Sequence, residues 1–299
     1  DDGNDSKELI IKNYPGEKTV LSSGIVLDLK WEKYKNGIMR AVVKGSPVMD
    51  MLFVNGELKS MARYPNYDEK AVRFNGTSAL ATAPERVKKW KCPEGGYLHA
   101  MHKHDWGDFH YRITGKNEKG ELQLEGGWQN NRPMGIHNEN RMVENIFEEL
   151  DAPGEWYYDK QEGWLYYYPL SDENINELVF ETPQLKNLIE IAGTSSHPVK
   201  NITIEGIELT QTIRTFMEHY EPLLRSDWTI YRGGTVVFRG TEKCALRDCY
   251  IHNVGGNGVF FDKYNRYSAV TGSYLTSIGA SAICFVGDVA GVRSPSFRY

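Results

Sequence analysis

Three short segments decide the fold of this chain: GTVVF (234–238), GVFFD (258–262) and AICFV (282–286). They align without gaps at a step of 24 residues. Each belongs to a repeat in which short apolar runs alternate with turns rich in glycine and asparagine. One such repeat cannot bury its apolar side alone, so successive repeats must stack on one another. The sequence therefore predicts a right-handed parallel β-helix, an all-β fold.

Other positions repeat at the same step of 24 residues, since 246–251 match 270–275 and 254–256 match 278–280. In stacked coils the matched side chains form ladders, here Leu246 over Val270 and Tyr250 over Tyr274. A propeller blade would need a repeat of about 40 residues or more. A coil with three short strands fits the observed step better.

One earlier coil carries an insertion. Residues 204–209 match 246–251 at a distance of 42, which is one coil plus 18 residues. The additional residues lie within 213–233. Long excursions from a rigid scaffold often carry function, so this stretch is a candidate site.

The middle of the chain has a different character. It holds six of the seven tryptophans, several strand-like runs and a hairpin pattern at 155–168. We expect first coils at 1–30, an inserted antiparallel β module at 31–180, and further coils at 181–299. Short helices are expected at 84–90 and 141–149. Because the repeat continues to the last residues without a cap, we also expect an internal piece of a longer protein.

Composition excludes some classes of function. The net charge of −5 argues against nucleic acid or an anionic membrane as the main partner. No apolar run approaches about 20 residues, so no membrane span is expected. The four cysteines are too few for a disulfide framework at this length, and we expect buried free thiols.

Three segments carry a family resemblance: NYPGEKTVLSSG (13–24), LFVNGELKSMARYPN (52–66) and NIFEELDAPGEWYYDKQEGWLYYYP (145–169). They resemble bacterial right-handed parallel β-helix carbohydrate-active proteins, nearest glycoside hydrolase family 141 and its uncharacterised relatives. That family is associated with α-L-fucosidase and xylanase activities on plant polysaccharides. The resemblance implies a secreted glycoside hydrolase, periplasmic or extracellular, that degrades a plant or algal polysaccharide or oligosaccharide without a metal or other cofactor. The family pattern has further coils before residue 1 and after residue 299.

Glycoside hydrolysis needs two carboxyl groups, about 5–5.5 Å apart in retaining enzymes and about 6.5–9.5 Å apart in inverting ones. Neighbouring coils of a β-helix lie about 4.8 Å apart, so carboxylates on adjacent coils can meet these spacings. Asp262 and Asp288 follow matched strands and form the candidate catalytic pair. In the alternative interpretation, both are turn residues that accept backbone hydrogen bonds.

The insertion supplies most of the predicted substrate-binding residues. Carboxylates and arginines suit sugar hydroxyls, and aromatic faces suit the apolar side of a pyranose ring. The alternative is a solvated excursion held by surface ion pairs, each of which contributes little. With two residues from the coil region, the set is Glu218, His219, Glu221, Arg225, Asp227, Trp228, Arg232, Asn257 and Lys263.

Two further clusters contain candidate binding residues. His102, His104, Asp105 and His110 would suit zinc if His102 and His104 shared one strand face, but surface histidines are the favoured interpretation. The run 128–132 with His137 is either a sugar-contact loop or a structural turn.

Two other functions fit the same fold. A polysaccharide lyase would use Asp262 as the base and Lys263, Tyr264 and Arg266 toward the uronate, and would admit Ca²⁺ as a cofactor. A carbohydrate-binding solenoid without catalysis is the third candidate.

Overall fold

The computed structural model describes residues 7–130, 134–222 and 229–288, and most of its elements are strands. The chain divides into two compact units. The coil unit comprises residues 1–25, 182–215 and 231–299, and the module unit comprises residues 26–181 and 216–230. Each unit is described by itself below.

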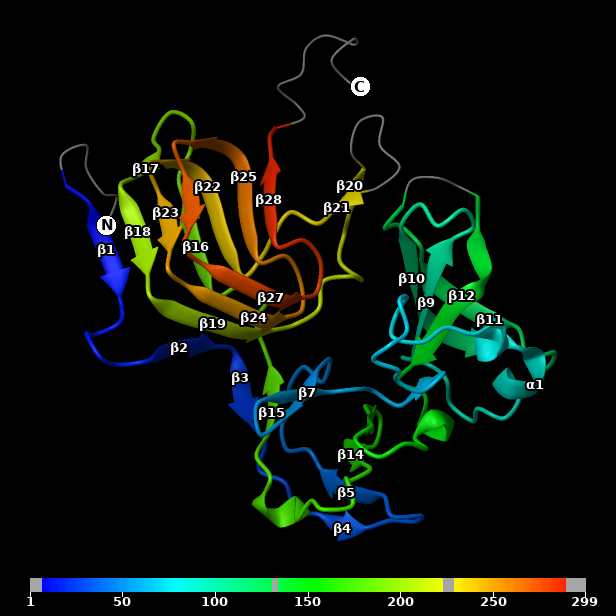
Figure 1. The fold of residues 1–299 in the computed structure, drawn as a ribbon. Coiled ribbons are helices and arrows are strands. Elements are labelled where there is room, and N and C mark those ends of the chain that lie inside the picture. Colours follow the sequence, from blue (N-terminus) through cyan, green and yellow to red (C-terminus); the bar gives the residue numbers. More distant parts are fainter. Residues whose placement is uncertain (1–6, 131–133, 223–228, 289–299) are drawn as a thin grey trace. The chain divides into compact units, whose positions relative to one another are not determined.

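Three parallel sheets build the coil unit, and each sheet takes one strand from each successive turn of the chain (Figure 1). The first sheet has the order β1-β18-β23-β26, the second β2-β19-β24-β27, and the third β16-β22-β25-β28 with β17 beside β22. This is a β-helix-like arrangement. The strands are β1 (Leu9–Lys12), β2 (Thr19–Ser22), β16 (Ile189–Ala192), β17 (Val199–Lys200), β18 (Ile202–Glu205), β19 (Ile207–Thr212), β22 (Val236–Glu242), β23 (Ala245–Arg247), β24 (Tyr250–Val254), β25 (Val259–Arg266), β26 (Ala269–Thr271), β27 (Tyr274–Ile278) and β28 (Ile283–Val286).

The core of the coil unit consists of aliphatic and aromatic ladders. Leu246 pairs with Val270 in the first sheet, and Ile204 pairs with Leu246 across the excursion. On the outside of the second sheet, the exposed Tyr250 pairs with Tyr274, and their rings stack with centroids 5.6 Å apart. Stacked coils thus cover the apolar sides that single coils would expose.

The register of the third sheet differs from the sequence alignment by one residue. The alignment of GTVVF with GVFFD would pair Val236 with Phe260, whereas the structure pairs Val236 with Val259 and Phe238 with Phe261. Periodicity could not fix this register, because these strands are apolar on both faces. Phe238 and Phe261 stack inside the coil at 4.9 Å.

Antiparallel strands dominate the module unit. Its sheets have the orders β11-β10-β9-β12-β8, β13-β14-β5-β4 and β3-β15-β6-β7, and β20 pairs with β21. The strands are β3 (Gly24–Val26), β4 (Glu32–Lys33), β5 (Met39–Val42), β6 (Leu52–Val54), β7 (Glu57–Lys59), β8 (Arg63–Tyr64), β9 (Tyr97–His102), β10 (Asp108–Lys116), β11 (Leu122–Gly126), β12 (Ile136–Glu144), β13 (Trp156–Asp159), β14 (Trp164–Tyr167), β15 (Phe180–Pro183), β20 (Glu221–Pro222) and β21 (Thr229–Ile230). The helical turns are η1 (Ala79–Thr82), α1 (Pro84–Val87), η2 (Phe147–Glu149) and η3 (Ile175–Glu177).

The hairpin expected at 155–168 is confirmed by the antiparallel pair β13–β14. The helix expected at 84–90 is a single turn, α1. The helix expected at 141–149 is wrong, because β12 continues to Glu144 and only η2 follows. The residues of β12 pair with β9 up to Glu144. Asn145 then adopts a left-handed conformation (φ 55°), which ends the strand.

Three of the four cysteines, Cys244, Cys249 and Cys284, are buried free thiols as expected, whereas Cys92 is exposed. Burial raises the pKa of all three buried thiols. None of the helices in the described part of the chain has the length and hydropathy needed to cross a membrane.

Candidate functional site

Asp262 lies on the outer face of the third sheet, beside a β-bulge. Phe261 before it points into the core, so Asp262 points outward. Arg239 of β22 pairs with Asp262 of β25, but Thr241 pairs with Asn265. Gly240 therefore lies opposite two residues of β25, and this extra residue is the bulge. The Asn265 side chain donates to the carbonyl oxygens of Asp262 (2.8 Å) and Phe238 (3.2 Å). The bulge is therefore closed by hydrogen bonds, and it fixes the direction of the Asp262 side chain.

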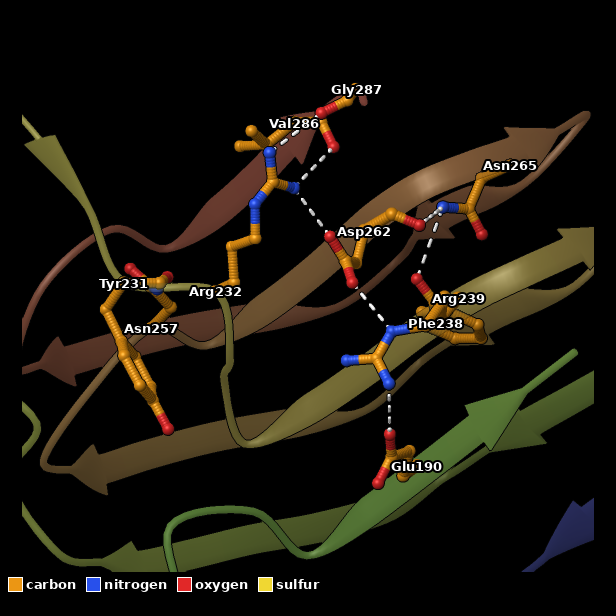
Figure 2. A network of polar contacts seen from close by, with 10 residues as sticks. All are labelled: Glu190, Tyr231, Arg232, Phe238, Arg239, Asn257, Asp262, Asn265, Val286 and Gly287. Carbon is orange, nitrogen blue, oxygen red and sulfur yellow. Dashed lines mark hydrogen bonds and ion pairs between the residues drawn. The ribbon is translucent and has the colours of Figure 1, made fainter. Parts of the chain in front are cut away.

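Two arginines hold the Asp262 carboxylate, as Figure 2 shows. Arg232 Nη1 donates to Oδ1 at 2.6 Å, and Arg239 Nε donates to Oδ2 at 2.6 Å. The Asp262 side chain is only 3% exposed, whereas that of Arg239 is 40% exposed. A buried carboxylate of this kind requires such partners, since an unpaired buried charge is very costly.

The network extends over all four strands of the third sheet (Figure 2). On one side, Arg239 Nη1 contacts Glu190 Oε1 of β16 at 3.2 Å. On the other, Arg232 donates to the carbonyl oxygens of Val286 (3.3 Å) and Gly287 (2.9 Å), at the end of β28. Charges alternate along this ladder, so each guanidinium lies next to an acceptor of opposite or partial negative charge.

Asn257, a predicted substrate-binding residue, is buried beneath the returning end of the excursion. Its Nδ2 donates to the carbonyl oxygens of Tyr231 (3.1 Å) and Gly233 (2.8 Å), and its Oδ1 accepts from the amide of Ser281 (3.1 Å). These contacts tie residues 231–233 to two coils. They place Arg232 beside Asp262, which is a positioning role.

Asp288 is exposed and lies two residues after Val286, the partner of Asp262 in the register. The two aspartates thus come from neighbouring coils at the same end of the third sheet. Lys263, also exposed, lies in the bulge with a left-handed backbone (φ 59°).

The residues that the lyase hypothesis places around Asp262 are engaged elsewhere. The Tyr264 hydroxyl donates to Glu242 Oε1 at 2.5 Å, and the Arg266 guanidinium lies over the Tyr264 ring. Glu242 also contacts Lys200 at 3.6 Å. Tyr264 and Arg266 therefore form a cluster centred on Glu242.

The acidic and aromatic part of the excursion belongs to the module unit. Trp128 Nε1 donates to the carbonyl oxygen of Glu218 at 2.8 Å. Glu221 starts the β20–β21 hairpin, and His219 is exposed. Arg225, Asp227 and Trp228 lie outside the described residues. Trp128 therefore serves as a hydrogen-bond donor to the excursion backbone.

The interpretation of the predicted histidine cluster as surface histidines is wrong for His102, which is fully buried, whereas His104 is exposed. β9 ends at His102, so His104 lies in the following turn, and its amide donates to His102 Nδ1 at 3.0 Å. The His102 ring stacks on Trp106 at 5.5 Å. Across residues 7–130, 134–222 and 229–288, no set of three His, Cys, Asp or Glu side chains is arranged to hold a metal.

His110 instead pairs with His99, a residue that the sequence analysis did not single out. The two lie opposite each other in the antiparallel β9–β10 pair, and their Nδ1 atoms are 2.7 Å apart. The strand patterns YLHAMH (97–102) and DFHYRI (108–113) contain the signal. A hairpin with its turn at 103–107 would have paired these two histidines.

Comparison with known proteins gives one informative match. No protein-family model matches the chain, and no curated protein matches its sequence. A solved structure described as "Glycoside hydrolase" superposes with a TM-score of 0.72 at 20% sequence identity. The match covers 91% of this chain and 54% of that one, so the chain spans about half the length of that structure. At this identity the likeness establishes a shared fold.

Proposed function

We propose that this protein is a carbohydrate-active hydrolase, a glycoside hydrolase whose catalytic face is the outer face of the third sheet around Asp262. The observation that carries the proposal is the buried Asp262 carboxylate, held by two arginines in a fold shared with a glycoside hydrolase. The sequence resemblance supports secretion and a plant or algal glycan as substrate, with α-L-fucosidase and xylanase activities as the first to test.

Asp262 and Asp288 are the proposed catalytic carboxyl groups. Asp288 is exposed, so a glycosidic oxygen can reach it, and it is the proposed proton donor. Asp262 uses one acceptor position on each oxygen for an arginine, and a carboxylate offers about four such positions. It can therefore still accept from a water molecule or face the anomeric carbon.

Arg239 is the member of the network that a sugar would displace. Its side chain is 40% exposed, whereas Arg232 is 18% exposed and also bound to backbone carbonyl groups. When Arg239 moves, one oxygen of Asp262 opens, and the guanidinium becomes available to sugar hydroxyls. Lys263 and Glu190 flank this position as further polar contacts.

The test is a panel of plant and algal glycans, including xylans and fucosylated polysaccharides, with three readouts. Release of reducing ends without ultraviolet absorbance from an unsaturated uronate would support the hydrolase. Appearance of that absorbance would replace it with a lyase. Binding in affinity electrophoresis, without either product, would replace it with a carbohydrate-binding solenoid.

A further inference from the structure

A buried pair of histidines lies in the five-stranded sheet of the module unit. His99 of β9 and His110 of β10 are direct cross-strand partners, and their Nδ1 atoms are 2.7 Å apart. The side chains are 7% and 13% exposed. A nitrogen–nitrogen contact of this length contains one hydrogen, so one ring donates and the other accepts.

Each ring also faces a carboxylate with its other nitrogen. His99 Nε2 lies 3.1 Å from Glu144 Oε1 on β12, and His110 Nε2 lies 3.3 Å from Asp108 Oδ2 on β10. Each Nε2 atom can therefore donate to a carboxylate, while the contact between the two Nδ1 atoms holds a single hydrogen.

Further charged and aromatic groups surround the histidine pair. Arg63 of β8 is the register partner of Glu144 and donates to the carbonyl oxygen of Phe74 at 2.7 Å. The Phe74 and Tyr97 rings lie beside His99, with centroids 6.2 Å away in each case. Burial opposes ionisation of Asp108, but the hydrogen bond and charge of His110 outweigh it and lower the pKa of that carboxyl.

Phe216, where the excursion meets the module unit, packs directly on this pair. Its ring centroid lies 5.1 Å from His99, 5.2 Å from His110 and 5.1 Å from Tyr97. Gln129 links the same elements through its side chain, because it accepts from the His110 amide (3.0 Å) and donates to the Phe216 carbonyl oxygen (2.7 Å). The position of Phe216 therefore depends on the closed geometry of the two imidazoles.

We propose that the His99–His110 pair is a proton-sensitive lock that holds Phe216 and the adjoining backbone on the β9–β10 sheet and releases them on acidification. Protonation of the accepting Nδ1 would place two N–H groups against each other at 2.7 Å in a buried site, with neither nitrogen left to accept. The rings must then separate, and Phe216 loses its contacts. The lock is closed near neutral pH and opens as the pH falls, within the range where histidine changes charge.

Amide hydrogen exchange of residues 216–221 in the intact protein tests the proposal, with rates corrected for their intrinsic dependence on pH. Between about pH 7.5 and pH 5, the protection of these amides should fall at least tenfold. In the variant His99→Gln, the side-chain amide can still accept from His110 and donate to Glu144 but cannot gain a proton. That variant should keep its protection at both pH values.

His252→Gln is the matched control, since His252 Nε2 makes a comparable bond to Glu208 (2.9 Å) in the coil unit. This control should respond to acid as the native protein does. If His99→Gln does not fold, ¹⁵N spectra of the native imidazoles replace it, and the change at both Nδ1 atoms must share its midpoint with the loss of protection. Protection that is unchanged by pH, or an equal acid response in the two variants, would overturn the proposal.

Discussion

Glu155 shows most clearly how a single buried residue couples this fold to pH. It is 3% exposed, and its Oε2 accepts from the amides of Asp151 (3.3 Å) and Ala152 (3.2 Å). Its buried Oε1 has no hydrogen-bond partner among the described residues. Burial raises the pKa of Glu155 to about 8, so the folded protein carries this group as the acid at neutral pH.

This raised pKa predicts a loss of stability with rising pH. Between the ordinary value of 4.5 and about 8, the unfolded chain releases the proton while the folded chain retains it. The free energy of unfolding therefore falls as pH rises through that window, by up to roughly 1.4 kcal/mol per pH unit. In Glu155→Gln, which imitates the acid form, urea unfolding should show a shallower decline. Equal slopes in the two proteins would contradict the assignment.

Asp262 is expected to be essential for stability as well as for the site. Asp262→Asn removes the carboxylate that Arg232 and Arg239 share, which should lower the free energy of unfolding by about 2–4 kcal/mol. The control is Glu205→Gln, which breaks a more exposed pair with Arg247 (3.1 Å) and should cost below about 1 kcal/mol. Urea unfolding of both variants measures the difference, and similar losses would mean that the Asp262 network is an ordinary surface pair.

Among the elements, the turn between β24 and β25 packs closely against the turn after β27. A Cβ atom on Gly279 would lie 2.5 Å from the backbone carbon and oxygen of Gly255 in the coil next to it. Gly279→Ala should therefore force the two turns apart and cost about 1–3 kcal/mol. Gly287→Ala is the control, because a Cβ atom there meets nothing within 4 Å. Equal melting temperatures for the two variants would show that the turns do not stack closely.

The same elements show which parts of the fold could be predicted. Pairs such as Leu246–Val270 follow from the sequence, because an aliphatic ladder has one inward position per coil. The pair Val236–Val259 could not be predicted, since three consecutive apolar residues fit either register and the bulge at Gly240 restores the step afterwards. Helix propensity at 141–149 was overridden by pairing of β12 with β9.

At the scale of the whole molecule, the candidate site brings together residues that lie far apart in the sequence. The sequence indicated Asp262 as a candidate catalytic carboxylate after a strand, but its burial depends on Arg232, which returns from the excursion 30 residues earlier in the chain. The contacts of Asn257 with residues 231–233 could not be predicted from the sequence either, because they depend on where the excursion re-enters the coil. Local pattern could predict the strands and the candidate residues, whereas the partners of those residues required the folded chain.

The measurement that tests the proposed function most directly is the turnover number of Asp288→Asn on the glycan that the native protein cleaves. The melting temperature of this variant, measured beside that of the native protein, separates a loss of catalysis from a loss of folding. Loss of the proton donor should lower turnover at least a hundredfold while affinity for the glycan is retained. A variant that turns over at the native rate would contradict the assignment of the catalytic face to the end of the third sheet.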